Sequence, residues 1–175
     1  MAIPVVEPER YQEQLDAKRD FLIERFAPLD APELEVYASP PSHYRQRCEF
    51  RVWHEGDDLY YAMFEVDPED PKKKTVVRLD EYPVASRRIN ELMPQLLDAV
   101  RDNPVLRRKL FQVEFLTTLT GEALITLIYH RPLGEDCERD ARWLQTHLGV
   151  SIIGRARKQR LVLERDHVWE RLEVD

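Results

Sequence analysis

The sequence predicts an α+β protein with a mixed, largely antiparallel β-sheet, flanking helices and one βαβ crossover. Three observations lead to this fold class. Pairs of segments alternate apolar and polar residues with the period of two typical of strands, and short turns join them. Three other segments repeat apolar residues every three or four positions, as amphipathic helices do. One helical segment lies between two apolar strands, which indicates a parallel crossover.

The chain begins with a predicted helical arm over residues 8 to 26. Pro8 suits the first position of a helix. Apolar side chains recur along one face of this helix at Tyr11, Leu15, Leu22 and Phe26. Residues 27 to 43 contain four prolines and are expected to form a linker. The remaining sheet and helices are expected over about residues 44 to 165, so that the whole chain, 1–175, forms a single domain.

The sheet begins with a predicted hairpin. From Tyr44 onward the pattern has period two, residues 55 to 58 predict a turn, and residues 59 to 66 predict the return strand. The polar stretch over residues 67 to 75 predicts an exposed loop. It leads to a short third strand with the sequence "TVVRL".

The stretch "HYRQRCEFRVWH", residues 43 to 54, places Arg45, Arg47 and Arg51 on one side of the first strand. Glu49 lies between the last two and is expected to orient both by ion pairing. The opposite side is more apolar and is expected to face the core: Gln46, Cys48, Phe50, Val52 and His54. Like charges on one face repel unless an anion compensates them. That anion can be a carboxylate of the protein or a phosphate backbone.

The second helix is predicted over residues 86 to 101, and Asn103-Pro104 ends it. Its apolar stripe is Ile89, Leu92, Met93, Leu96, Leu97 and Val100. Because proline removes an intrahelical hydrogen bond and clashes with the previous turn, Pro94 predicts a kink or a later helix start.

A second hairpin is predicted from strands over residues 110 to 118 and 123 to 129. A third helix follows over residues 135 to 148, with an apolar stripe of Cys137, Ala141, Leu144 and Leu148. Strands near residues 150 to 155 and 161 to 164 complete the chain. The strand before the third helix and the strand after it are expected to lie parallel, in a right-handed crossover.

The composition excludes several classes of protein. Among 175 residues, 43% are apolar, which is enough for a core without disulfides. No apolar run approaches the roughly 18 to 20 residues of a membrane span, and the N-terminal sequence lacks a signal-peptide layout, so we expect a cytoplasmic protein. Cys48 and Cys137 lie far apart, without the spacing of a metal site, and are expected to be buried.

The charge distribution favours one basic face. The net charge of −7 argues against indiscriminate nucleic-acid binding. Acidic residues crowd into three stretches, whereas no acid lies between Ser151 and Leu163. The cations of that segment are Arg155, Arg157, Lys158 and Arg160. A chain with such segregated charge can bind anions despite its acidic total.

No catalytic motif is visible. The sequence lacks G-x-S-x-G, H-E-x-x-H, Walker and G-x-G patterns, and its five glycines are scattered. The five histidines lie on separate predicted elements. What remains is a combination of cations and rings: Arg107, Arg108 and Lys109 precede Phe111, and His130 and Arg131 end the neighbouring strand.

Cations that follow phosphates and rings that stack on bases are the groups that bind single-stranded or looped RNA. Two other interpretations stay open. Phe111 can be a core residue, and the arginine face of residues 45 to 51 can be an ordinary ion-paired surface. The residues therefore predict no more than a candidate RNA-binding α+β domain.

Three stretches resemble the N-terminal half of the bacterial tRNA (uracil-5-)-methyltransferases: "PPSHYRQRCEFRVWHEGDDLYY", "NPVLRRKLFQVEFLTTLTGEALITLIYH" and "IIGRARK". The likeness runs from about residue 8 to about residue 172. It implies an enzyme that uses S-adenosyl-L-methionine (SAM) to form 5-methyluridine, ribothymidine, at the T-loop uridine of tRNA. The family's Rossmann-like SAM-binding domain, with its cysteine nucleophile and carboxylate base, is absent from this chain. We expect it to follow residue 175, and we expect this chain alone to be inactive and to bind no SAM.

The resemblance also implies RNA-binding residues. The family's contacts in this half fall on Arg51, Phe111 and His130. Position alone adds Tyr44, Arg45, Arg47 and Gln112. The implied partner is the tRNA T-arm, together with other RNAs that have T-loop-like folds, and no membrane, DNA or metal is expected. A free-standing RNA-binding module and a protein interaction domain without catalysis are the alternatives.

Overall fold

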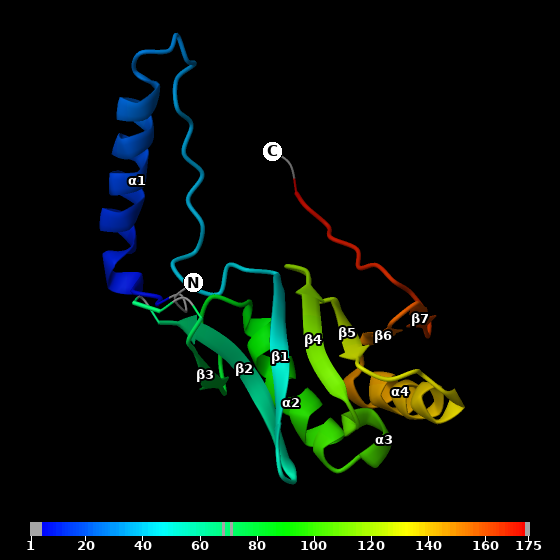
Figure 1. The fold of residues 1–175 in the computed structure, drawn as a ribbon. Coiled ribbons are helices and arrows are strands. Elements are labelled where there is room, and N and C mark those ends of the chain that lie inside the picture. The colour runs from blue at the N-terminus through cyan, green and yellow to red at the C-terminus, as the bar shows by residue number, and fades with distance from the viewer. Residues whose placement is uncertain (1–4, 68, 71, 174–175) are drawn as a thin grey trace.

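The computed structural model describes residues 5–67, 69–70 and 72–173 and has the predicted α+β architecture (Figure 1). The strands are β1 (Arg47–Glu55), β2 (Asp58–Val66), β3 (Lys74–Leu79), β4 (Leu110–Thr117), β5 (Ala123–Tyr129), β6 (Ser151–Ala156) and β7 (Gln159–Val162). The helices are η1 (Pro8–Arg10), α1 (Tyr11–Phe26), α2 (Arg87–Arg101), α3 (Pro104–Arg107) and α4 (Glu135–Leu148). The loop predicted over residues 67 to 75 includes positions 68 and 71, which lie outside the described residues.

The strands form one seven-stranded sheet in the order β3-β2-β1-β4-β5-β6-β7. Strands β5 and β6 pair in parallel, and the other neighbours pair antiparallel. The predicted mixed sheet and the parallel β5-α4-β6 unit are therefore confirmed. Gly149 ends α4 in the left-handed conformation, with φ of 63°, where a side chain would be strained.

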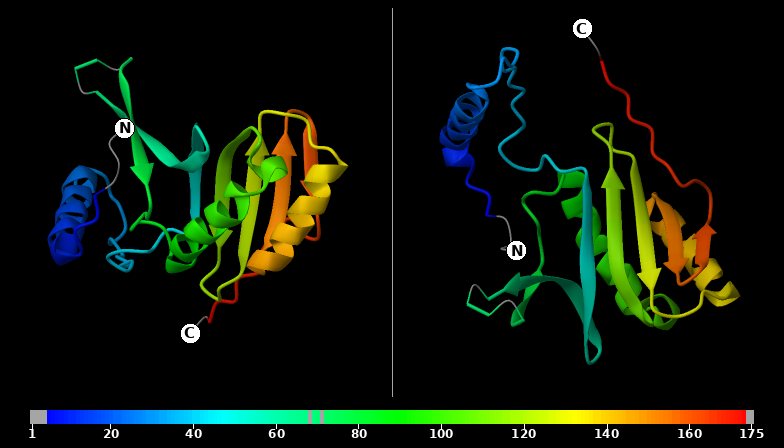
Figure 2. Two further views of the ribbon diagram at one scale, coloured as in Figure 1. Left: turned by 90° about the horizontal axis from the view of Figure 1, so that it is seen from below. Right: turned by 45° about the horizontal axis from the view of Figure 1, so that its top comes forward.

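Helices α2 and α4 lie against one face of the sheet (Figure 2). The core forms between them and the strands, and it includes Phe50, Tyr61 and Phe115, whose ring centroids lie 5.5 to 6.1 Å apart. The alternation predicted for β1 is confirmed at its centre, because Cys48, Phe50 and Val52 are buried while Arg47 and Glu49 are exposed. It is wrong for His54, which is exposed because the end of β1 lies outside the core. We call the opposite face, which carries Arg47, Glu49 and Arg51, the helix-free face.

Helix α2 runs through Pro94 without interruption, so the prediction of a later helix start is wrong. The Ser86 hydroxyl accepts a hydrogen bond from the Ile89 N–H and caps the first turn. Burial of the apolar stripe on the sheet outweighs the missing proline N–H. The short helix α3 was not predicted, although Asn103 caps it and Pro104 occupies its first position.

The helical arm is present as η1 and α1. Its predicted apolar face is not buried by any part of the chain that the structure describes. No residue of α1 is buried, and Phe21 is 62% exposed. Figure 1 shows α1 standing apart from the sheet beside the linker, where the Tyr11 and Ser39 hydroxyls lie 3.3 Å apart. None of the helices in the described part of the chain is long and apolar enough to cross a membrane.

Candidate functional site

A β-bulge places Phe111 on the helix-free face. Leu110 pairs with Tyr129 and Gln112 pairs with Ile128, so Phe111 is an extra residue without a partner on β5. A bulge interrupts the alternation of a strand and re-aims a side chain, and bulges are enriched next to functional sites. Here the extra residue brings Phe111 to the same side as its neighbour Gln112.

Phe111 forms the centre of a three-membered stack with Arg51 and His130, which we call the stacked trio. The Arg51 Cζ lies 3.5 Å from the Phe111 ring centroid. The His130 ring lies 3.6 Å from the same centroid, with an interplanar angle of 25°. Two groups this close to one ring centre cannot share a face, so they cover opposite faces of Phe111. The three residues that the resemblance implied are thus brought together.

Phe111 is a half-buried residue outside the apolar core, so its interpretation as a core residue is wrong. His130, at the end of β5, is exposed. Phe111 therefore acts as a spacer between a cation and an imidazole that both reach solvent. His130 is exposed and Arg51 is partly exposed, so a further planar group can reach both ends of the stack.

Arg51 makes no ion pair with any residue that the structure describes. Burial lowers the pKa of its guanidinium, since desolvation disfavours the charged form. The expectation that Glu49 pairs with both neighbouring arginines is therefore wrong for Arg51. Glu49 lies 3.9 Å from Arg47, which also lies 3.7 Å from Glu114, while Arg51 lies on the Phe111 ring instead.

The other predicted residues separate into two groups. Gln112 lies next to the trio, opposite Arg51 in the sheet. Arg47 pairs with Leu116 nearer the other end of β1. Arg45 and Tyr44 precede β1 and lie beyond this end of the strand, where Arg45 forms an isolated bridge with Ala85. The structure therefore does not bring these three residues to the stacked trio.

The cations near Phe111 brace the loops that hold it. Arg107 donates to a backbone carbonyl of the β1–β2 turn at 2.7 Å, and Arg131 donates to a backbone carbonyl of α3 at 2.6 Å. Lys109 has a left-handed backbone with φ of 58°, and its carbonyl oxygen accepts a hydrogen bond from the His130 N–H at 3.0 Å. Such strained residues cluster at functional sites. The hydrogen bond between Lys109 and His130 fixes the position of His130 relative to Phe111.

A hollow of about 840 Å³ opens beside the stacked trio. It is lined by Ile128, Tyr129, His130, Arg131, Pro132, Arg155, Ala156 and Arg157. None of these described residues is acidic. The basic segment after Ser151 lies beside His130, a proximity that local sequence pattern does not indicate, because it depends on the pairing of β5 with β6.

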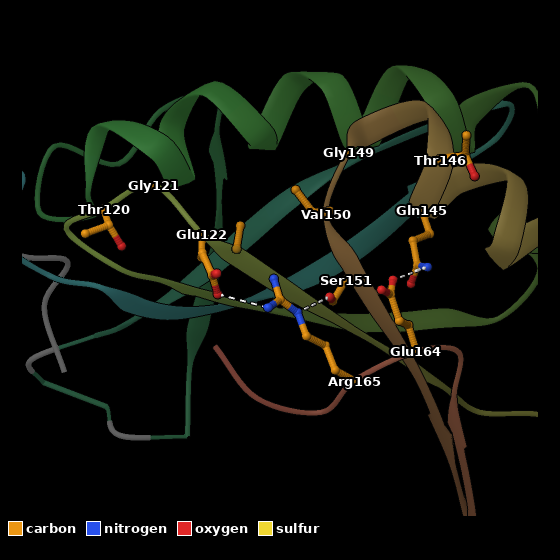
Figure 3. Close-up of a pocket in the computed structure, with 11 residues that line it drawn as sticks. Thr120, Gly121, Glu122, Gln145, Thr146, Gly149, Val150, Ser151, Glu164 and Arg165 are labelled. Atoms are coloured by element: carbon orange, nitrogen blue, oxygen red, sulfur yellow. Dashed lines mark hydrogen bonds and ion pairs between the residues drawn. The ribbon is translucent and has the colours of Figure 1, made fainter. Parts of the chain in front are cut away.

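A second hollow, of about 520 Å³, lies at the other end of the β4–β5 hairpin and has a different character (Figure 3). Arg165 lies 3.2 Å from Glu122 and donates to the Ser151 hydroxyl at 3.0 Å. Gln145 donates to Glu164 at 3.1 Å. Among the described residues that line this hollow, the one cation, Arg165, is thus already bound by the protein.

The two cysteines of this chain lack the exposure of reactive thiols. Burial raises the pKa of the Cys48 thiol to about 11 and also raises the pKa of Cys137, so both are protonated at neutral pH. Their predicted burial is confirmed. In the described ranges, no group of three or more His, Cys, Asp or Glu residues is placed to hold a metal ion.

Comparisons with known proteins agree on one family. The family model for tRNA (Uracil-5-)-methyltransferase matches residues 10–175. A curated relative from Chromohalobacter salexigens, named tRNA/tmRNA (uracil-C(5))-methyltransferase, is 73% identical over 100% of this chain and 47% of its own length. A relative of the same name from Vibrio atlanticus is 54% identical over the same shares. This chain thus spans about half the length of these relatives.

A solved structure shares the fold. It is Pyrococcus abyssi tRNA (uracil-54, C5)-methyltransferase in complex with S-adenosyl-L-homocysteine, with a TM-score of 0.53 and 17% sequence identity. The match covers 85% of this chain and 35% of that chain. Since the family model spans nearly the whole sequence, the chain belongs to the tRNA (uracil-5-)-methyltransferase family.

Proposed function

We propose that this chain is the RNA-binding part of a SAM-dependent tRNA (uracil-5-)-methyltransferase that forms 5-methyluridine at the T-loop uridine of tRNA in the cytoplasm. The names of the relatives support a methyltransferase acting on uracil C5 in tRNA and tmRNA. The tmRNA in those names extends the proposal to a second RNA. The part of the protein outside this chain would supply the reaction itself.

The stacked trio is the observation that carries this proposal. RNA with unpaired bases is bound by planar side chains that stack on them and by cations that attract phosphates. Both faces of Phe111 are covered in the free protein. A displaced base therefore extends the stack on the outer face of His130 or Arg51, and Phe111 holds these two groups in place.

Stacking by His130 or Arg51, supported by Phe111, suits the binding of a base that normally lies inside a folded loop. An enzyme that modifies such a base has to take it out of its stack, which costs a few kcal/mol. A surface that stacks and holds the displaced nucleotides compensates part of that cost. We assign this holding role to the stacked trio.

The described residues between β5 and α4 do not fit a SAM-binding loop. In the β5-α4-β6 unit, the joint before α4 contains one glycine among the described residues, Gly134, whereas cofactor loops of this kind need several for close backbone approach. SAM is proposed as the methyl donor of the full-length enzyme, where it supplies the methyl group. No step of methyl transfer is assigned to this chain.

A titration of this chain with RNA hairpins tests the proposed function. One hairpin carries a T-loop, and the control has the same stem with an unrelated loop. We expect the T-arm hairpin to bind more tightly, with a slope of log affinity against log salt of roughly −3 to −5 if about five phosphates are contacted. Equal affinity for the two hairpins would contradict the proposal, and a salt-dependent interaction without loop preference would favour an acidic partner of another kind.

A further inference from the structure

The register of the sheet continues the line of Arg51 across four more strands. Arg51 lies opposite Gln112, Gln112 opposite Ile128, Ile128 opposite Arg155, and Arg155 opposite Arg160. Residues opposite one another in neighbouring strands point to the same face. Strands lie about 4.8 Å apart, so the Cα atom of Arg155 is about 14 Å from that of Arg51. One row of side chains therefore connects the stacked trio with the β6–β7 hairpin.

The cations at the far end of this row are not neutralised equally. Arg155 and Arg160 are directly opposite like charges, an arrangement that destabilises a sheet. Arg160 is compensated by Asp166 at 2.7 Å. Within residues 5–67, 69–70 and 72–173, Arg155 and Arg157 make no ion pair, and both are exposed. They leave a local positive charge that an external anion can compensate.

The hollow beside the trio joins these cations to His130. His130, Arg155 and Arg157 all line it, and none of its described lining residues is acidic. A nucleotide strand with one base stacked on His130 would thus continue into a cavity that Arg155 and Arg157 line.

We propose that Arg155 and Arg157 bind the phosphate backbone of the RNA strand that continues from the stacked trio. This inference rests on the proposed function, since the trio must hold a base for the strand to take this path. The guanidinium group suits the role because it presents several N–H donors in a planar array that matches phosphate oxygens. Backbone contacts position the RNA and carry no sequence information.

The double variant Arg155→Ala/Arg157→Ala tests the inference with the same two hairpins. We expect affinity for both hairpins to fall by the same factor, because phosphates are common to both. Loss of two phosphate contacts should flatten the salt slope by about 1.4 to 1.8. The ratio of wild-type to variant affinity should therefore shrink about tenfold when salt rises from roughly 50 to 200 mM. The preference for the T-loop should be unchanged.

The matched control is Arg139→Ala/Arg142→Ala, which removes two exposed cations from α4 beneath the other face of the sheet. We expect its salt slope to equal that of the wild type. Equal effects of the two double variants would overturn the inference, because overall charge alone would then explain the loss.

Phe111→Ala separates this inference from the proposed function. That variant should lose loop preference and keep its salt slope. If it does so while Arg155→Ala/Arg157→Ala leaves the slope at the wild-type value, the phosphate path is wrong and the proposed function stands. If the wild type itself does not prefer the T-loop, the proposed function fails and takes the path with it. Competition by polyglutamate as strong as that by RNA would also reject the path.

Discussion

The two ends of the β4–β5 hairpin have opposite electrostatic characters. At the turn end, Arg165 is bound by Glu122 and the Ser151 hydroxyl. At the other end, Arg51 and Arg155 lie on the same face of the same sheet without a carboxylate partner among the described residues. The turn end therefore stabilises the fold, and the other end has the character of an anion-binding surface.

The C-terminal tail, residues 163–173, causes this difference. After β7 it returns across the turn end, where the Trp169 N–H donates to Glu122 and Glu170 accepts from the Leu119 N–H. Thr126 and Ile153 on the helix-free face are 8% and 4% exposed. Charged groups that bind the tail stabilise the fold. Charges beyond its reach stay available for a partner.

The largest expected effect comes from Phe111→Ala. Without the central ring, Arg51 and His130 lose their shared support, and T-arm affinity should fall by about 1 to 3 kcal/mol, the usual worth of one base stack. Fluorescence anisotropy with a labelled hairpin measures the change. Phe64→Ala is the matched control, because Phe64 is also a half-buried ring, packed against Trp53 at 6.1 Å. An equal loss in both variants would point to folding instead of binding.

Removal of Arg51, at the end of the hairpin opposite the turn, should have a smaller effect. Arg51→Ala should weaken binding by about 0.5 to 2 kcal/mol, the range of a cation–π contact. It should also flatten the salt slope by about 0.7 to 0.9 if the guanidinium contacts one phosphate. Arg51→Lys keeps the charge but not the planar stack. It should restore the slope and only part of the affinity. An unchanged slope in Arg51→Ala would remove this residue from the phosphate contacts.

The turn end should respond in the opposite way. Arg165→Ala removes a partly exposed ion pair and a hydrogen bond, so the free energy of unfolding should fall by about 0 to 1 kcal/mol in a urea titration. Hairpin affinity and its salt slope should stay at wild-type values. A clear loss of affinity would mean that the tail end also contacts RNA, and the contrast between the two ends would disappear.

Acid should loosen the turn end through Glu122. The backbone N–H of Trp169, and then Arg165, lower the pKa of Glu122 below its ordinary value of 4.5. A lowered folded-state pKa stabilises the folded state above the ordinary pKa, and that contribution is lost as pH falls through the folded-state value. Trp169 fluorescence, followed in a Trp53→Phe/Trp143→Phe background, should therefore change below about pH 4.5. In a Glu122→Gln variant this acid transition should be absent.

Local pattern was sufficient for most of the fold. Alternation placed Phe50 inside and Arg47 outside, and helical periodicity found the buried stripe of α4. It also found α2 and its buried stripe, but the later helix start inferred from Pro94 is wrong, because packing of a whole apolar face outweighs one proline. It also failed for α1, whose apolar residues predict a buried face that the fold does not form.

The candidate site needed information that local pattern does not contain. Arg51, Phe111 and His130 were connected by resemblance, and their stacking depends on a bulge that no periodicity indicates. The position of Arg155 beside His130 depends on the pairing of β5 with β6. Residues far apart in sequence meet only once the register of every intervening strand is fixed.

Because Phe111 is the extra residue of the β-bulge, its deletion should remove the stacked trio without disturbing the rest of the sheet. Without Phe111, Leu110 would pair with Tyr129 and Gln112 with Ile128 in an uninterrupted ladder, with the inward and outward order of β4 intact. The deletion variant should therefore keep a folded sheet and bind RNA with lower affinity. Loss of one residue could therefore remove this function while Arg51 and His130 stay in the sequence.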